Sequence, residues 1–142
     1  MRCNFKIISF RDVEIDGRLI DLHNNFHFVG FAYDVSLDTF VINFKKGIGT
    51  WIPEDELEAV KFLHRKISFL NIHSITENAY PEDAKTLSEI TFYPSSERNE
   101  NNNFMERNTP DPADDLIYSF LQGKLIRINC EEVTLLESPS IA

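Results

Sequence analysis

Basic residues are scarce in this sequence: 14 lysines and arginines stand against 23 aspartates and glutamates, which gives a formal net charge of −9. Nucleic-acid affinity rests on neutralising phosphates with lysine and arginine, so this shortage disfavours nucleic acids and anionic membranes as partners. The imbalance is concentrated from Glu77 onward, where 13 acids meet only five bases. An acidic field of this kind attracts basic proteins at long range.

Cysteine and long apolar runs are scarce as well. Cys3 and Cys130 are the two cysteines of the chain. No apolar run approaches the roughly 18–20 residues that span a bilayer. The N-terminal residues lack the long apolar core of a signal peptide, so we expect a first strand there, a cytoplasmic protein and two reduced thiols.

Motifs for catalysis and metal binding are also missing. No serine sits in a G-x-S-x-G turn, and the glycine-containing loop at 46–50 lacks the rest of a phosphate-binding motif. The stretch 12–17 resembles the start of an EF-hand loop, but His23 stands where that loop needs a bidentate glutamate. His23 and His27 have the i, i+4 spacing that would suit zinc on a helix, but this region is predicted as strand, where they would lie about 13 Å apart. We expect a non-enzymatic protein with no metal and no cofactor, and the sequence leaves open whether the fold gathers a histidine or carboxylate cluster.

Alternation of apolar and polar residues with a period of two is abundant, and it indicates β-strands. Phe40, Ile42 and Phe44 point one way along one such stretch. The preceding stretch, 26–33, is apolar or amphipathic at nearly every position, which predicts a central strand covered on both faces. The two stretches form a predicted β-hairpin closed through residues 35–38.

Further strands and turns follow from the same pattern. A small hairpin is predicted around the Asp16-Gly17 turn, because both residue types tolerate positive φ. A strand is expected from Leu87 to Tyr93, where Pro94 closes it. A tight hairpin is expected around Gln122-Gly123. Its strands are 116–121 and 124–130, with an extension to Val133 and Leu135.

The stretch 52–73 supports two interpretations. Leu57, Val60 and Leu63 keep a helical spacing behind an acidic first turn. Two short alternating runs, broken at 64–66, indicate strands instead. The β character of the neighbouring segments favours strands.

These patterns together predict a mainly β fold, with α+β as the other possibility. The predicted architecture is a single antiparallel β-sandwich or curled sheet of about seven to nine strands with at most one short helix. Residues 1–142 form one predicted domain, since the chain has the length of an ordinary domain and shows no repeat.

A polar segment at 95–113 interrupts the predicted strands, and we expect it to be flexible. It holds few large apolar residues. The segment and the residues directly after it hold many acids. An acidic, mobile segment is suited to steering a basic protein partner toward apolar anchors. The predicted partner-binding residues are Glu97, Glu100, Phe104, Met105, Glu106, Asp111, Asp114, Asp115 and Tyr118.

The runs 26–34, 37–44, 114–120 and 125–130 resemble small acidic β-rich bacterial proteins of unassigned function, some of which act as immunity proteins of toxin systems. The resemblance is one of strand pattern and carries over no functional residue. It implies an acidic protein that occludes a basic toxin domain. The combined expectation is a non-enzymatic, acidic protein-binding module, of which an immunity protein that neutralises a basic toxin domain is the specific form. A small-molecule-binding β domain, or an enzyme that uses a Phe-lined pocket, is the alternative, and a sizeable apolar cavity would favour it.

Overall fold

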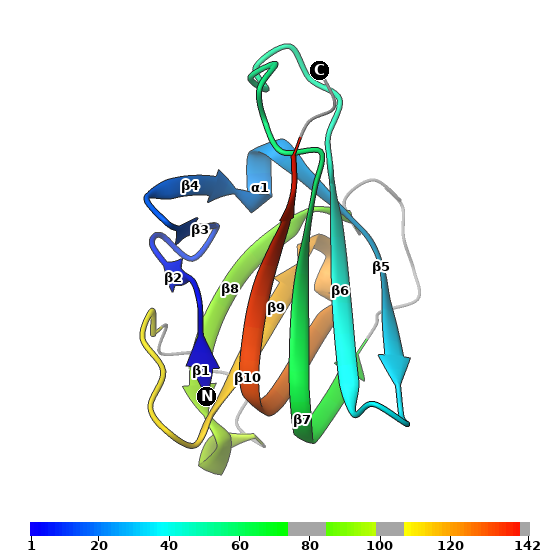
Figure 1. The fold of residues 1–142 in the computed structure, drawn as a ribbon. Helices are drawn as coiled ribbons and strands as arrows, with labels where there is room; N and C mark the ends of the chain where they lie inside the picture. Colours follow the sequence, from blue (N-terminus) through cyan, green and yellow to red (C-terminus); the bar gives the residue numbers. More distant parts are fainter. Residues whose placement is uncertain (74–84, 99–106, 140–142) are drawn as a thin grey trace.

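The computed structural model describes residues 1–73, 85–98 and 107–139 of the chain (Figure 1). The strands are β1 (Arg2–Cys3), β2 (Lys6–Ile7), β3 (Asp12–Ile15), β4 (Arg18–Asp21), β5 (Phe26–Asp34), β6 (Thr39–Lys46), β7 (Ala59–His73), β8 (Leu87–Pro94), β9 (Asp114–Phe120) and β10 (Leu125–Ser138). The helical elements are α1 (Leu22–Asn25) and the 3₁₀ turns η2 (Ser95–Glu97) and η3 (Leu121–Gly123).

The main sheet has seven strands in the order β5-β6-β7-β10-β9-β8, with β1 added beside β10 in parallel. All the other pairings in this sheet are antiparallel. The sheet curls into a half-barrel, so that β8 and β9 pass behind β10 and β7 in the view of Figure 1. A small sheet, β2-β3-β4, lies with α1 on the β8 side. The predicted mainly β, curled antiparallel architecture with one short α-helix is confirmed. No helix in the described ranges is long and apolar enough to cross a bilayer.

The predicted hairpins are present. Asp16 and Gly17 join β3 to β4 with φ of 50° and 80°, the left-handed values that a two-residue hairpin turn requires. Gly123, with φ of 84°, closes the hairpin of β9 and β10 through η3. β5 and β6 pair antiparallel on either side of the turn at 35–38.

The stretch 59–73 is one long strand, β7, so the preference for strands over a helix is confirmed. Its first half buries every second residue, Val60, Phe62 and His64, as a strand with one covered face must. The predicted break at 64–66 is not a gap between strands. Lys66 instead adopts a positive φ of 58°, and the pairing with β10 shifts register nearby.

β5 differs from its prediction as a central strand covered on both faces. It is the last strand of the main sheet, and Val29, Phe31 and Tyr33 are exposed. The physical reason is a β-bulge, because the register with β6 shifts between Phe28 and Gly30, and Gly30 has φ of 141°. The extra residue reverses the alternation, so Phe28 and Phe31 both point to the concave face.

The interior of the half-barrel is packed with aromatic rings. Phe28 lies 4.7 Å from Phe120, and Phe44 lies 5.9 Å from Phe62, measured between ring centroids. Phe5, just after β1, packs edge-on against Phe62 at 5.3 Å. Buried side chains of β3, β4 and α1 join the same core cluster. The small sheet and α1 thus close part of the open side of the curled sheet.

Candidate functional site

The nine predicted partner-binding residues fall into three groups, which are exposed, buried, or outside the described residues. Glu97 and Asp111 are exposed. Asp114, Asp115 and Tyr118, all on β9, are buried, with 3 %, 0 % and 0 % of their surface exposed. Glu100, Phe104, Met105 and Glu106 lie outside the described residues.

Asp115 is the centre of a buried ion-pair network. Its carboxylate accepts hydrogen bonds from Arg98 at 2.8 Å, from Arg127 Nε at 2.6 Å and from the Asn129 amide at 2.9 Å. Burial alone would raise the pKa of Asp115, but these hydrogen bonds and the Arg127 charge hold it below its usual value. The Arg98 guanidinium also stacks 3.7 Å from the Phe69 ring centroid. The network therefore fastens the start of the 95–113 segment to β7, β9 and β10.

Arg107 fastens the other end of that segment. Its guanidinium bonds to Asp114 and, at 2.6 Å, to Asp111. Its backbone carbonyl accepts from the Phe92 amide at 3.0 Å, which pairs it with β8. The expected flexibility of 95–113 stays a prediction, and residues 99–106 of this segment lie outside the described residues.

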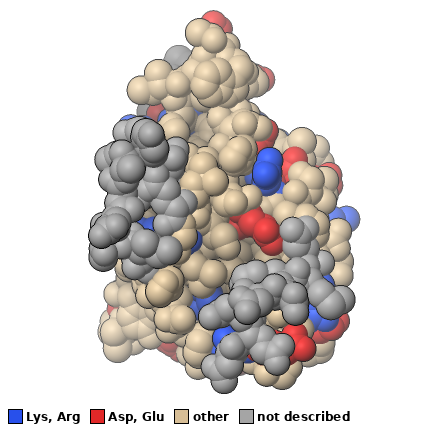
Figure 2. Space-filling view, turned by 180° about the vertical axis from the view of Figure 1, so that it is seen from behind, with Lys and Arg blue, Asp and Glu red and all other residues tan. Residues whose placement is uncertain are grey.

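The prediction that Asp114, Asp115 and Tyr118 form the rim and anchor of a docking surface is therefore wrong in its geometry. A rim charge or an anchor must reach a partner, and these side chains are inside the protein. Much of the acidic charge of this region is neutralised by arginines within the fold. On the face seen in Figure 2, acidic and basic side chains are interspersed among neutral surface rather than gathered in one acidic patch.

Tyr118 instead belongs to a buried hydrogen-bond chain that links three strands. His64 Nδ1 donates to the Phe40 carbonyl at 2.8 Å, so its Nε2 must be the acceptor of the Tyr118 hydroxyl, also at 2.8 Å. His64 has no exposed surface, and burial lowers its pKa to about 4. The chain ties β6, β7 and β9 together, and burial keeps His64 neutral.

We expect this histidine to make the protein less stable as pH falls from about 6.5 to about 4. Above about 6.5 His64 is neutral in both states, whereas below it the unfolded chain binds a proton that the folded protein, with a pKa of about 4, excludes. The loss amounts to about 3 kcal/mol at most. Urea unfolding at several pH values should show a flatter profile for the double variant His64→Phe/Tyr118→Phe. The variant His73→Gln, which changes an exposed histidine, should keep the wild-type dependence of stability on pH. If the double variant showed that same dependence, this role of His64 would be refuted.

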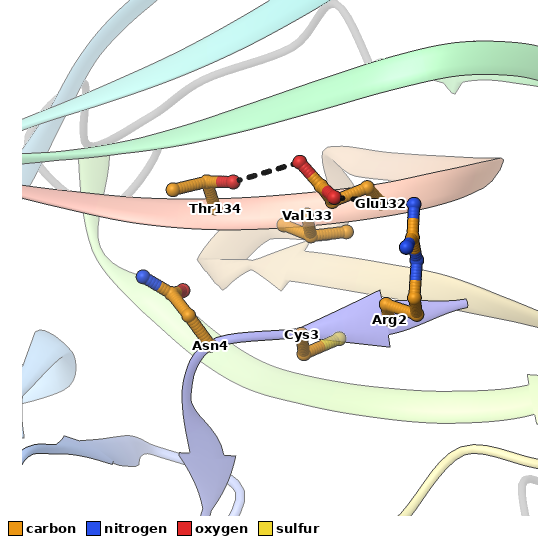
Figure 3. A pocket seen from close by; sticks show the side chains of 6 residues that line it. All are labelled: Arg2, Cys3, Asn4, Glu132, Val133 and Thr134. Atoms are coloured by element: carbon orange, nitrogen blue, oxygen red, sulfur yellow. Dashed lines mark hydrogen bonds and ion pairs between the residues drawn. The ribbon is translucent and has the colours of Figure 1, made fainter.

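Three pockets follow the N-terminal segment. The pocket in Figure 3, with a volume of about 270 Å³, lies between β1 and β10, where Cys3 and Asn4 face Val133 and Thr134. A neighbour of about 330 Å³ extends from Cys3 toward the β3–β4 turn. A third, of about 210 Å³, is lined by charged residues of β1, β7 and β10. Phe5 is the one phenylalanine among the residues that line these three pockets.

The Cys3 thiol, which lines two of these pockets, is not activated as a nucleophile. Burial raises the pKa of the Cys3 thiol to about 11 and that of Cys130 to about 12, so both are protonated and poor nucleophiles at neutral pH. Both thiols are free, as expected. Cys3 stands opposite Val133, about 10 Å along β10 from Cys130, which is too far for a disulfide. Glu132 is held by Arg2 and Arg65 at 3.3 and 2.9 Å. The described residues contain no group of three potential metal ligands.

The β5–β6 hairpin carries the most pronounced exposed apolar surface among the described residues. We call it the hairpin surface, and it consists of Val29, Phe31, Tyr33, Val35 and Leu37. Val35 and Leu37, at the turn, are 78 % and 70 % exposed. Asp34 is exposed and Asp38 is half-buried within the same turn, and neither forms an ion pair with a described residue. Hydrogen bonds from the Ser36 hydroxyl and the Leu37 amide lower the pKa of Asp34.

The turn between β5 and β6 and the 3₁₀ turn η2, which follows β8, lie at the same end of the sheet, the lower end in Figure 1. The Asp38 carbonyl and carboxylate accept the amides of Lys66 and Ile67 at 3.1 and 3.2 Å. Phe69, two residues further along β7, stacks on Arg98, the residue after Glu97. One short stretch of β7 thus holds both the hairpin turn and the exposed beginning of the polar segment.

Sequence reasoning missed this surface because the bulge hides it. The available signals were Gly30 within an apolar strand, which often marks a bulge, and the apolar residues of the turn itself.

A scan against protein-family models finds no match, and comparisons with curated proteins and with solved structures find no significant match either.

Proposed function

We propose that this chain is a non-enzymatic protein-binding module for a basic protein partner. The observation that carries the proposal is the hairpin surface, in which five large apolar side chains are exposed beside the carboxylates of Asp34 and Asp38, which form no ion pair with a described residue. Large apolar side chains that are exposed on one element beside polar groups are typical of protein interaction sites. The cytoplasmic location expected from the sequence is part of the same proposal.

A basic partner is supported by charge at two scales. The whole chain carries −9, which favours encounter with a cationic protein. At the end of the sheet that holds the hairpin turn, Asp34, Asp38 and the exposed Glu97 supply acids that a basic rim could meet. Glu97 and Asp111 stay candidate rim residues in this proposal, and the apolar anchoring moves to Val35 and Leu37.

An immunity protein that neutralises a basic toxin domain is the specific form of this proposal. It rests on the resemblance of strand pattern and on the acidic charge. Against the ligand-binding or enzymatic alternative stands the packing of the core phenylalanines Phe28, Phe44, Phe62 and Phe120, which contact one another and line none of the three pockets described above.

The proposal is tested by capture of a partner from an extract of the source organism on the immobilised protein. We expect a basic protein to bind, and the double variant Val35→Ser/Leu37→Ser to lower its affinity by about tenfold or more, because anchor residues dominate interfaces. Capture should weaken as salt rises from about 50 to about 500 mM, because exposed charges are screened.

Ile48→Ser is the matched control, since Ile48 is 98 % exposed and lies outside the hairpin surface. It should bind as the wild type does. Equal binding by the hairpin variant would refute the role of this surface. A purified protein that retains a metabolite or turns over a substrate would refute the binding-module proposal itself.

A further inference from the structure

The two edge strands of the main sheet, β8 and β5, differ in how far other described residues cover them. At the β8 edge, the Ile90 amide donates to the Phe10 carbonyl at 2.7 Å and the Phe92 amide to the Arg107 carbonyl at 3.0 Å. His23 Nδ1 donates to the Leu87 carbonyl at 2.6 Å. These contacts cover an edge that would otherwise present free backbone groups to another chain.

The β5 edge has no such cover among the described residues. β5 pairs with β6 on one side, and no described strand pairs with its other side. The bulge at Val29–Gly30 disturbs the first part of this edge, which leaves the regular stretch 31–34 for pairing. This stretch is also part of the hairpin surface.

We propose that the basic partner adds a strand to the β5 edge, by placing an extended segment along residues 31–34. This inference rests on the proposed function and names its mode of binding. Strand addition obtains affinity from main-chain hydrogen bonds and specificity from alternate side chains.

The side chains of β5 define what the added strand should contain. Phe31 and Tyr33 stand opposite Ile42 and Phe40, so they face the concave side, where they are partly exposed. Ala32 and Asp34 face the other side. An added strand therefore suits apolar residues on the concave face and basic residues opposite Asp34.

The same charge argues against a second copy of this chain as the added strand. Two molecules of −9 repel each other at long range, whereas a basic segment is attracted. Pairing of two β5 edges is therefore an outcome that the test must detect.

The test uses a peptide of about ten residues that alternates lysine with valine as its probe, at the length of an ordinary strand. The matched control is the same peptide with N-methylated central amides, which keeps its charge and side chains but cannot donate main-chain hydrogen bonds. We expect the unmodified peptide to bind at least about tenfold more tightly. On binding, hydrogen exchange should slow at alternate amides of residues 31–34. Equal affinity of the two peptides, absence of binding, or protection elsewhere would overturn the proposal.

Ala32→Pro and Tyr33→Pro test the same edge from the side of the protein. Amides of neighbouring strand residues point to opposite edges, so one of these prolines removes an outward donor and the other a bond to β6. The variant that keeps the wild-type melting temperature should lose peptide binding. If it binds both the peptide and the captured partner like the wild type, strand addition is wrong while the protein-binding function stands. Concentration-dependent dimers that the same proline abolishes would identify a second copy as the occupant instead and overturn the proposal.

Discussion

Replacing Asp115 by Asn should lower the free energy of unfolding by about 3–5 kcal/mol, because it leaves buried charge without its partner. Asp115 and Arg127 have 0 % and 5 % of their side-chain surface exposed, and their atoms lie 2.6 Å apart. Asparagine keeps the shape of the side chain but not the negative charge. Arg127 would be the buried charge left without its partner, since Arg98 is more exposed to solvent.

Urea unfolding at neutral pH measures this effect. Asp111→Asn is the matched control, because Asp111 also meets an arginine but is 69 % exposed. Exposed ion pairs contribute about 0–1 kcal/mol, so the control should be nearly as stable as the wild type. Similar small losses for both variants would mean that Asp115 does not organise the interior.

Replacing Phe44 by Ala should also cost about 3–5 kcal/mol, as deletion of a buried phenyl ring usually does. Phe44 is 1 % exposed, and its ring contacts those of Phe28, Phe62 and Phe120. The same loss is expected for Phe28→Ala and Phe40→Ala, which are also buried.

Chemical denaturation of these variants should show lower midpoints with little change in slope. Phe31→Ala is the control within the same hairpin, since Phe31 is 42 % exposed, and it should cost clearly less. Unchanged stability for Phe28, Phe40 and Phe44 variants together would contradict the strand and core assignment.

The strands of this fold were predictable because their signals are local. Alternation in β6 and the Asp16-Gly17 turn each depend on a few adjacent residues, and both appear as expected. The face of β5 was not predictable from alternation, because one inserted residue at the bulge reverses it. Edge or centre position also depends on sheet order, which strand pattern does not encode.

The candidate site was harder to predict because the burial and pairing of its residues depend on partners that are distant in the sequence. Asp114 and Asp115 look like solvated acids in the sequence, and only the fold brings Arg98, Arg107 and Arg127 to them. A count of charges therefore overstates the acidic surface of this region. Likewise, Tyr118 becomes a structural residue because β7 places His64 against its hydroxyl.

The most direct test of the proposed function is the dissociation constant of the captured basic partner, measured for two variants side by side. One is Val35→Ser/Leu37→Ser in the hairpin surface. The other is Glu97→Gln/Asp111→Asn, which removes the exposed acids among the described residues of the polar segment. We predict that the hairpin variant weakens binding by about tenfold or more, mainly through faster dissociation, while the acid variant mainly slows association. Unchanged binding by the hairpin variant, with binding lost in the acid variant, would contradict docking on the hairpin and return the interface to the polar segment.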